Sequence, residues 1–384
     1  MGDVVEDYVE KTTVEDQYPV LTSSQRKGIV LQDDFFAGDR VNQNGNIGYF
    51  IIPRGYFAFR SRSDNDVFVF NRNDAVDMGI ISYFYPVFKP RGVDSDFLLR
   101  RLNYGLEDQI KINSEGTGQH VLSLKKFKNM IGLFPSYEEQ KKIGSYFSQI
   151  DHLITLHQRK CDETKRLKKY MLQKMFPQNG EKVPEIRFSG FTDDWEQRKL
   201  GDIGKARSGV GFPDAEQGGV TGIPFFKVSD MNLDGNENEM TVANNYVTAE
   251  QIAVHRWSPI TELPAIFFAK VGAAVMLNRK RLCRFPFLLD NNTMAYSLSP
   301  TKWDADFAKA LFGTVDLTSL VQVGALPSYN ARDVESMEIY LPSLLEQEQI
   351  GGFFKQLDTL ITLHQRELEN LQNIKKFMLG KMFV

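Results

Sequence analysis

Apolar residues recur at alternating steps of three and four positions in two stretches of the chain, Pro135–Phe176 and Pro342–Phe383. A 3.5-residue period held over such a length is typical of a coiled coil rather than of a helix lying on a globular core. About 40 residues at ~1.5 Å each predict two helical arms of roughly 60 Å. The positions in step are Ile143, Phe147, Ile150, Ile154, His157, Cys161 and Thr164 in the first arm, and Ile350, Phe354, Leu357, Ile361, His364, Leu368 and Leu371 in the second.

The two arms are copies of one another. A constant shift of 207 residues aligns them without a gap, with 23 of 42 positions identical, and the run LITLHQR at Leu153–Arg159 returns unchanged at Leu360–Arg366. Each arm opens with Pro-Ser-x-x-Glu, which predicts a capping box. In that motif the serine accepts one free backbone N–H, and the glutamate three residues on (Glu139 or Glu346) reaches back to another. The duplication predicts two helices that pair and do the same job twice.

Further leucines widen the apolar stripe of each arm, so a helix from a partner protein could also pack there. We therefore predict a set of residues for helix–helix and partner packing. It comprises Ile143, Phe147, Ile150, Leu153, Ile154, Leu156 and His157, with Ile350, Phe354, Leu357, Leu360, Ile361, Leu363 and His364. His157 and His364 occupy equivalent positions, and a ligand or catalytic role is the alternative for them. Since no Cys, Asp or Glu stands at metal spacing on both arms, we interpret them as polar residues that fix register.

Two blocks with short β-rich runs between Gly, Asn, Asp and Arg clusters precede the arms, which predicts an α+β protein with two mixed α/β domains. The runs are Gly48–Ile52, Tyr56–Phe59 and Val67–Phe70 in the first block, and Ile223–Val228, Ala265–Phe268, Ala273–Leu277 and Met294–Leu298 in the second. The predicted domains are residues 1–133, the first arm 134–177, a connector with the second block 178–340, and the second arm 341–384.

The blocks share a frame but not an interior. Asp94–Phe97 echoes Asp304–Phe307, whereas Tyr18–Asn71 and Ile223–Asp290 scarcely agree. This contrast predicts that the arms serve one common purpose while the blocks address two different targets. The first block has no equivalent of Pro184–Leu200, so either that crossing segment is dispensable there or the chain is a shortened form.

Composition narrows the classes of function. A net charge of −3 means that any nucleic-acid surface must be a local patch. The only two cysteines, Cys161 and Cys283, stand at non-equivalent places and predict a reducing compartment without a disulfide framework. We expect no membrane span and no signal peptide, because no long uncharged apolar window occurs and the first residues are acidic. The expected location is the cytoplasm.

The motifs of common enzyme sites are absent from the sequence. There is no P-loop, no Asn/Asp-Pro-Pro-aromatic loop of an amino-methyltransferase, and too few Cys and His for a zinc site. A metal-dependent nuclease would need clustered carboxylates near a lysine, and Glu139 with Lys141 lies instead in the first turns of an arm. We predict no catalytic residue and no metal ligand.

Polar and basic residues do gather in the loops of the divergent blocks. Arg and Lys neutralise phosphates, and Asn, Gln and Arg can pair with base edges in the major groove. The alternative is that loops are polar in any protein. The candidate DNA-binding residues are Thr22, Ser23, Ser24, Arg26, Lys27, Asn44, Arg60 and His120 in the first block, and Lys205, Arg207, Lys227, Ser229, Asn278, Arg279, Lys280, Arg281, Tyr329 and Asn330 in the second.

Several phrases together carry a family resemblance. They are the Pro-Ser-x-x-Glu-Gln openings at Pro135–Gln140 and Pro342–Gln347, the FxxxDxLIxLHQR core and KxMLxKMF ending of each arm, and PEIRFSGFTDDWEQRKLGDI before the second block. With this layout, essentially the whole chain resembles the specificity subunit of type I restriction–modification systems.

The resemblance implies that each block is a target-recognition domain reading one half of a split site in double-stranded DNA. It also implies that the arms pack antiparallel with pseudo-two-fold symmetry and fix the unspecified gap. The arms would dock two methyltransferase subunits, and nuclease–translocase restriction subunits would join the complex. The chain would then be a non-catalytic subunit of a DNA adenine methyltransferase and endonuclease. S-adenosylmethionine, Mg²⁺ and ATP would be bound by the partners and no cofactor by this chain. The competing hypotheses are a coiled-coil adaptor without DNA readout and a nuclease acting alone.

Overall fold

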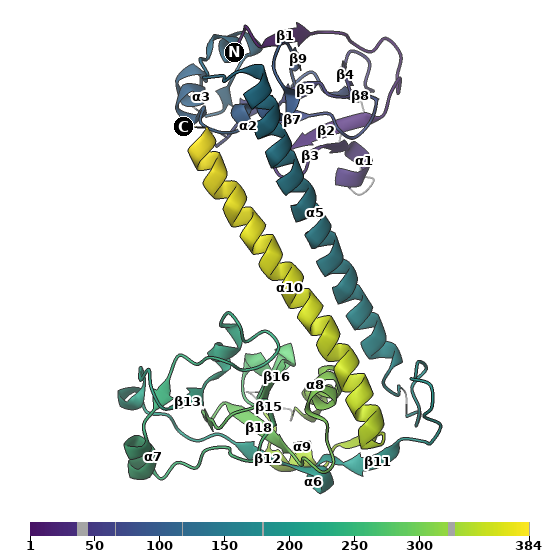
Figure 1. Ribbon diagram of the computed structural model, residues 1–384, viewed down its shortest axis with the longest axis vertical. Coiled ribbons are helices and arrows are strands. Elements are labelled where there is room, and N and C mark those ends of the chain that lie inside the picture. Colours follow the sequence, from purple (N-terminus) through teal and green to yellow (C-terminus); the bar gives the residue numbers. More distant parts are fainter. Residues whose placement is uncertain (37–44, 66, 117, 179, 322–326, 384) are drawn as a thin grey trace. The chain divides into compact units, whose positions relative to one another are not determined.

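The computed structural model describes residues 1–36, 45–65, 67–116, 118–178, 180–321 and 327–383, and the chain divides into two compact units. Unit 1 comprises Met1–His157 and Glu367–Val384, and unit 2 comprises Gln158–Arg366. The predicted arms are the two long helices of Figure 1, α5 (Tyr137–Lys174) and α10 (Leu344–Met382). Each unit therefore contains one α/β block and a part of both helices. No helix within the described ranges is long and apolar enough to cross a membrane.

Unit 1 is built on two four-stranded sheets. One is antiparallel with the order β1 (Val5–Tyr8), β9 (Val87–Pro90), β5 (Phe57–Phe59) and β7 (Phe70–Arg72). The other has the order β3 (Gly28–Leu31), β2 (Val20–Ser24), β8 (Met78–Ile81) and β4 (Phe50–Pro53), with β2 and β8 parallel. A short pair, β6 (Arg62–Ser63) with β10 (His120–Val121), and helices α1 (Gln32–Phe35), α2 (Ser95–Leu102), α3 (Glu107–Asn113) and α4 (Leu124–Asn129) complete the block.

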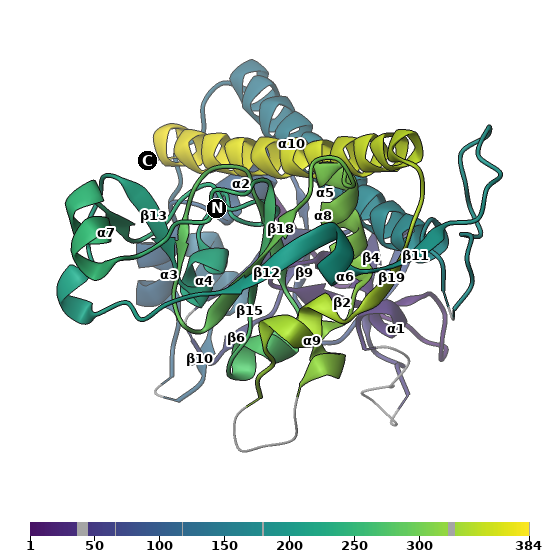
Figure 2. The same cartoon turned by 90° about the horizontal axis from the view of Figure 1, so that it is seen from below.

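Unit 2 repeats the antiparallel sheet in the same order, with β12 (Gly204–Ser208), β18 (Thr293–Leu298), β15 (Ala265–Ala269) and β16 (Lys280–Cys283). Figure 1 shows the four strands one above another in this order, and in Figure 2, seen from below, β12 lies in front. Its other strands are β14 (Tyr246–Val247), β13 (Ile223–Phe226) and β17 (Leu288–Leu289) in one sheet, and β11 (Glu196–Lys199) paired with β19 (Glu338–Leu341). Its helices are α6 (Leu200–Ile203), α7 (Ala249–His255), α8 (Ala305–Thr314) and α9 (Ala331–Glu335), with 3₁₀ turns at η1 (Asp214–Glu216), η2 (Val228–Asn232), η3 (Ala273–Leu277) and η4 (Leu317–Leu320).

Two predicted strands differ from the structure. In Val67–Phe70 only Phe70 lies in a strand, because β7 begins there. The second run contains no strand at all. Ala273–Leu277 forms the 3₁₀ turn η3, which starts after Gly272 at a φ of 83°. Only Val275 of this run is buried, while Met276 and Leu277 are more than half exposed. The run is apolar like a buried strand, but its single buried residue matches a short turn lying on the core.

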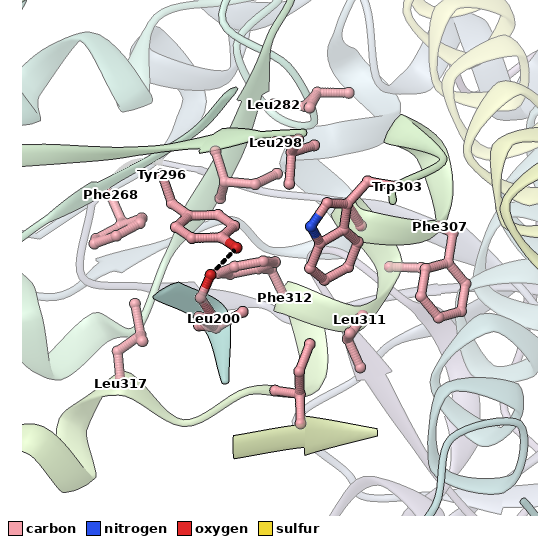
Figure 3. Packing of buried hydrophobic residues seen from close by; sticks show 14 of the residues in the cluster. Leu200, Phe268, Leu282, Tyr296, Leu298, Trp303, Phe307, Leu311, Phe312 and Leu317 are labelled. Atoms are coloured by element: carbon pink, nitrogen blue, oxygen red, sulfur yellow. Dashed lines mark hydrogen bonds between the residues drawn. The ribbon is translucent and has the colours of Figure 1, made fainter. Parts of the chain in front are cut away.

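Aromatic side chains fill the core of unit 2 (Figure 3). The Tyr296 hydroxyl donates a 2.7 Å hydrogen bond to the Leu200 carbonyl, and Trp303 Nε1 donates at 3.0 Å to the Ile203 carbonyl. Phe307 and Phe312 pack around them and are fully buried. Burying a large apolar side chain contributes about 1.5–3 kcal/mol. A buried hydroxyl or indole N–H needs a hydrogen-bond partner. Here the partners are two carbonyl groups of α6, so these bonds hold α6 against the core.

The arm segments run antiparallel in each unit. In unit 1 the Phe147 and Phe383 ring centroids lie 5.9 Å apart, and Asp151 pairs with Lys375 at 2.6 Å. A step forward along α5, from residue 147 to 151, therefore matches a step backward along the second arm, from residue 383 to 375. In unit 2 the corresponding contacts are Phe176 with Phe354, at 5.8 Å between ring centroids, and Lys168 with Asp358. Each contact of one unit is the other unit's contact shifted by 207 residues. The pseudo-symmetry implied by the resemblance is thus present contact by contact within the units.

Each α/β block is attached to its arm by the same set of bonds. Gln140 accepts a hydrogen bond from the Asp94 backbone at 3.0 Å, and Gln347 accepts one from Asp304 at 3.0 Å. Both aspartates are N-caps, and their side chains accept from the backbone N–H three residues on, in α2 and α8. The sequence echo at Asp94 and Asp304 therefore marks the point where the block meets the arm.

The helix starts agree with half of the predicted capping box. Ser136 and Ser343 each accept the backbone N–H three residues on, at 3.4 Å. The glutamate of the second arm does not reach back. Glu346 is 1 % exposed and accepts 2.7 and 2.8 Å bonds from the Arg187 guanidinium and a 3.4 Å bond from Trp195 Nε1. Its role is to hold the connector against α10.

Replacing Glu346 by glutamine is expected to lower the free energy of unfolding by about 1.5 kcal/mol, because a charge-assisted bidentate bond becomes a neutral contact beside a half-buried guanidinium. Urea denaturation would measure this. Glu139→Gln is the matched control at the equivalent position of the first arm, where the side chain is exposed. Its expected change is below about 0.5 kcal/mol. Equal effects of the two substitutions would contradict the role given to Glu346.

Candidate nucleic-acid interface

The turn between β2 and β3 in unit 1 presents two cations. The Ser24 hydroxyl accepts hydrogen bonds from the backbone N–H groups of Arg26 at 3.2 Å and Lys27 at 3.1 Å. Gly28 closes the turn with a φ of 72°, a conformation that favours glycine. A serine that binds the backbone two and three residues on stabilises such a turn. The backbone of both cationic residues is thereby fixed.

This turn borders a groove of about 630 Å³. Six of the eight candidates of the first block line it, namely Thr22, Ser23, Ser24, Arg26, Lys27 and Arg60. Gln25, Phe35, Phe36, Arg62, Ser63, Asp64, Asn65, Val67, Val69, Asn71 and Tyr85 complete the lining. Four cations and one carboxylate make the groove net positive, and its hydroxyl and amide groups add donors and acceptors. Such a lining suits phosphates and base edges together.

Aromatic rings and an asparagine position the polar side chains. The Lys27 ammonium lies 5.6 Å from the centre of the Phe35 ring, and the Arg62 guanidinium lies 5.2 Å from that of Phe84. Asn71 of β7 donates to the Ser23 hydroxyl at 2.8 Å and to the Ser24 carbonyl at 3.0 Å. Cations held over ring faces lose less freedom when they bind an anion.

His120, a further candidate of the first block, is not among these lining residues. His120 is on β10, opposite Ser63 of β6. Asn44 lies outside the described residues.

In unit 2 the early candidates lie on β12 and at η2. Lys205 and Ser229 are exposed. Arg207 donates to the Ser258 and Pro259 carbonyls at 3.1 and 3.4 Å, which ties β12 to that loop. Lys227 donates at 2.9 Å to Gln217. Two of these side chains face solvent and two also support neighbouring loops.

The basic cluster Asn278–Arg281 is bound largely within its own block. The Asn278 side chain donates to the Val315 carbonyl at 3.2 Å and accepts from the Leu317 backbone at 3.1 Å. Lys280 donates to the Asn278 side chain at 2.7 Å and also to the Val315 carbonyl, and burial lowers the pKa of its ammonium to about 8. Arg281 donates at 2.6 Å to the Asn236 carbonyl, and Arg279 at 2.7 Å to the Asn232 side chain. Of the four, Arg279 is held by a single side-chain amide rather than by backbone.

Tyr329 and Asn330 have structural partners as well. The Tyr329 hydroxyl is buried and donates a 2.6 Å bond to the Ala269 carbonyl. Asn330 caps α9, accepting from the backbone N–H groups of Arg332 and Asp333 and forming a capping box. Their side-chain acceptors and donors thus serve the block's own backbone.

Several groove residues are not among the candidates that the sequence indicates, foremost Asn71 and the rings of Phe35 and Tyr85. Asn71 follows Phe70 at the end of a β-rich run, and a polar residue at the end of such a run was the available signal. The rings carry no signal in the sequence, because a large apolar aromatic residue is more often part of the core.

The arms show a buried seam and an exposed stripe. Among the predicted packing residues, Phe147, Ile150, Ile350, Phe354, Leu357 and Ile361 are buried, and Ile143, Ile154, Leu156, His157 and His364 are half-buried. Leu153, Leu360 and Leu363 are 41, 44 and 50 % exposed. Tyr170 and its repeat equivalent Phe377 are exposed as well. Leu153 with Leu360, and Tyr170 with Phe377, are thus exposed apolar residues at equivalent places of the two arms.

No group of three or more His, Cys, Asp or Glu side chains in the described part of the chain could hold a metal ion.

The two arms repeat the same contacts, whereas the two α/β blocks present different polar residues. This arrangement is that of a protein in which one repeated scaffold carries two different binding domains. A family model described as the type I restriction modification DNA specificity domain matches residues 12–166 and 192–373. The chain belongs to this family.

Relatives in sequence agree with this assignment, and solved structures share the fold. The type I restriction enzyme MjaVIII specificity subunit of Methanocaldococcus jannaschii is 24 % identical over 295 residues, which are 70 % of this chain and 65 % of that protein. The putative MjaX specificity subunit of the same organism is 22 % identical over 361 residues, covering 91 % of this chain and 76 % of that one. The type I restriction–modification S subunit from M. genitalium aligns with a TM-score of 0.59 at 14 % identity, covering 99 % of this chain and 97 % of that chain.

A second solved chain comes from work on complex assembly and conformational transition of the type I R-M system. It has a TM-score of 0.51 at 14 % identity, with 99 and 97 % of the two chains covered. At this identity the structural likeness concerns the fold.

Proposed function

We propose that the chain is the DNA sequence-specificity subunit of a type I restriction–modification complex. Each α/β block reads one half of a bipartite target, and the arms fix the unspecified gap between the halves. The observation that carries the proposal is the unequal duplication. The contacts between the arms, such as Asp151–Lys375 and Lys168–Asp358, are repeated pair for pair, whereas the polar faces of the blocks differ.

In the first half-reader, the groove beside the β2–β3 turn contacts DNA. Arg26, Lys27 and Arg60 bind phosphates there, and the hydroxyl and amide groups of the same lining face base edges. In the second, Lys205, Lys227, Ser229 and Arg279 make the contacts. We rank Arg207, Asn278, Lys280, Arg281, Tyr329 and Asn330 below these, because their side chains already bond to backbone groups of the block.

The exposed leucines of the two arms bind two methyltransferase subunits, one for each copy of the repeat, and restriction subunits join that assembly. The methyl transfer takes place on a base flipped out of the duplex into the partner, since an exocyclic amine is not accessible within the stack. The chain supplies no catalytic residue, and S-adenosylmethionine, Mg²⁺ and ATP belong to the partners. The complex acts in the cytoplasm, where prokaryotic DNA lies.

Genome-wide sequencing of modified bases tests this function. Cells expressing the chain with its cognate methyltransferase are compared with cells lacking the chain. The expected result is a modified motif split by a fixed gap that appears only with the chain. Exchanging residues 1–133 for another first block should change one half of the motif and leave the other half and the gap intact. A complex that forms without any chain-dependent modification would favour the adaptor hypothesis.

A further inference from the structure

The two units differ at the strand that precedes each arm. In unit 2, β19 pairs with β11 of the connector, with Ile339 opposite Arg198 and Leu341 opposite Glu196. The 207-residue shift places Ile131–Phe134 of unit 1 at the position of β19, yet this stretch forms no strand. Ile131 and Leu133 are 75 and 77 % exposed. Among the described residues of unit 1, no strand pairs with this counterpart of β19.

One edge of this stretch is already held within unit 1. The Gln109 side chain accepts a 2.7 Å hydrogen bond from the Ile131 N–H and donates to the Ile131 carbonyl. Because backbone groups alternate in direction along an extended chain, Gly132 and Phe134 present theirs to the opposite edge. A groove of about 300 Å³, lined by Met1–Val4, Lys128–Gly132 and Phe134, follows this edge.

The first hydrogen bond along this edge is equivalent in the two units. In unit 2 the Leu200 N–H, directly after β11, donates to the Met337 carbonyl at 3.0 Å. In unit 1 the Met1 amino group donates to the Met130 carbonyl, and Met130 is the equivalent of Met337. Both Leu200 and Met1 are buried. The edge that β11 covers in unit 2 thus begins beside Met1 in unit 1.

The side chains that hold the connector in unit 2 also have equivalents. Glu346 binds Arg187, and the Phe353 ring lies 6.2 Å from the Phe188 ring. Their counterparts in unit 1, Glu139 and Tyr146, are exposed, the latter at 36 %. Helix α5 therefore presents an exposed carboxylate and an exposed ring at the same spacing as the pair that holds the connector on α10.

The place of the connector tryptophan is filled differently. Trp195 lies 5.9 Å from the Phe307 ring in unit 2. In unit 1 the Phe134 ring lies 5.9 Å from Phe97, the counterpart of Phe307. Phe134 thus contacts the counterpart of the residue that Trp195 contacts in unit 2. Recognition at the edge depends on backbone pairing, Glu139 and Tyr146.

We propose that the surface formed by Met130–Phe134, Glu139 and Tyr146 binds an extended peptide by strand addition. The peptide has the chemistry of the connector, an arginine followed by an aromatic residue and then a short strand. Main-chain hydrogen bonds supply affinity in this mode, and side-chain contacts supply specificity. The inference concerns protein recognition and does not rest on the proposed DNA function.

A synthetic peptide with the sequence of Pro184–Lys199, which stops before the place that Met1 occupies, tests the proposal against the full chain. It carries a fluorophore and a photo-crosslinker. Saturable binding is expected, with crosslinks mapping to residues 131–146. Glu139→Arg should weaken binding at least tenfold, and a peptide with Arg187→Glu should restore it in that variant. Glu138→Arg, at the exposed neighbouring carboxylate, is the matched control and should leave affinity unchanged.

N-methylation of the peptide tests the strand pairing without altering the protein. Methylation at the position of Arg198 removes an N–H that faces the edge and should reduce binding at least tenfold. Methylation at Gln197, whose N–H faces away, should have no effect. The proposal is wrong if the peptide does not bind, if crosslinks map only to residues 338–353, or if Glu139→Arg changes nothing. Self-association of the chain that Glu139→Arg abolishes would instead assign the surface to a second copy.

Discussion

Replacing Gly351 by alanine is expected to lower the free energy of unfolding by about 2 kcal/mol, although alanine is the better helix former. A Cβ at this position would overlap the Asp304 carboxylate and lie 2.6 Å from the Phe307 nitrogen. Helix α10 would have to move away from the capped start of α8. Overpacking and the loss of an N-cap together cost about 3 kcal/mol, and the gain in helix propensity returns about 1 kcal/mol.

The adjacent glycine is a matched control for this prediction. A Cβ at Gly352 would have no atom within 4 Å, so Gly352→Ala should raise the free energy of unfolding by up to about 1 kcal/mol. Gly144→Ala should behave like Gly351→Ala, since its Cβ would lie 2.8 Å from the Phe97 nitrogen. Urea denaturation measures all three. Stabilisation by both Gly351→Ala and Gly352→Ala would show that close approach of arm and block is not required.

The arms could be predicted because the buried positions of a long helix recur at regular steps of three and four residues in the sequence. The steps of three and four placed Phe147 and Phe354 in a seam, and the structure buries both. The role of the arm glycines could not be predicted in the same way. Gly351 and Gly352 are neighbouring glycines, and nothing in the sequence indicates that a side chain would be tolerated at only one of them. The difference arises because Asp304, distant in sequence, lies next to Gly351 in the fold.

The candidate site could be predicted where its residues are local. Thr22–Lys27 is the end of one strand with the turn that follows it, and Arg60 lines the same groove. The Asn278–Arg281 cluster shows the opposite case. The Val315 carbonyl, 37 residues from Asn278, and the Asn236 carbonyl, 45 residues from Arg281, bind its side chains. No local pattern reveals such an acceptor, because it depends on the tertiary fold.

A triple substitution of Arg26, Lys27 and Arg60 by alanine is expected to lower the affinity for a DNA duplex containing the target about a hundredfold near physiological salt. Each neutralised phosphate contributes about 0.9 to the slope of log affinity against log salt, so removing three cations should reduce that slope by nearly three. The three cations line one groove, where a single stretch of backbone can meet them. Fluorescence anisotropy at several salt concentrations, on the complex with its methyltransferase, measures both quantities.

The control for this triple variant removes the same charge elsewhere in unit 1. Lys125, Lys141 and Lys142 are exposed and do not line the groove. Their replacement by alanine should change affinity less than tenfold through the general field alone. Because the substitutions in the groove act on one block, the half-site assigned to the other block should keep its base preference in competition with mutated duplexes. Equal losses of affinity in the two triple variants would mean that overall charge, rather than this groove, holds the DNA.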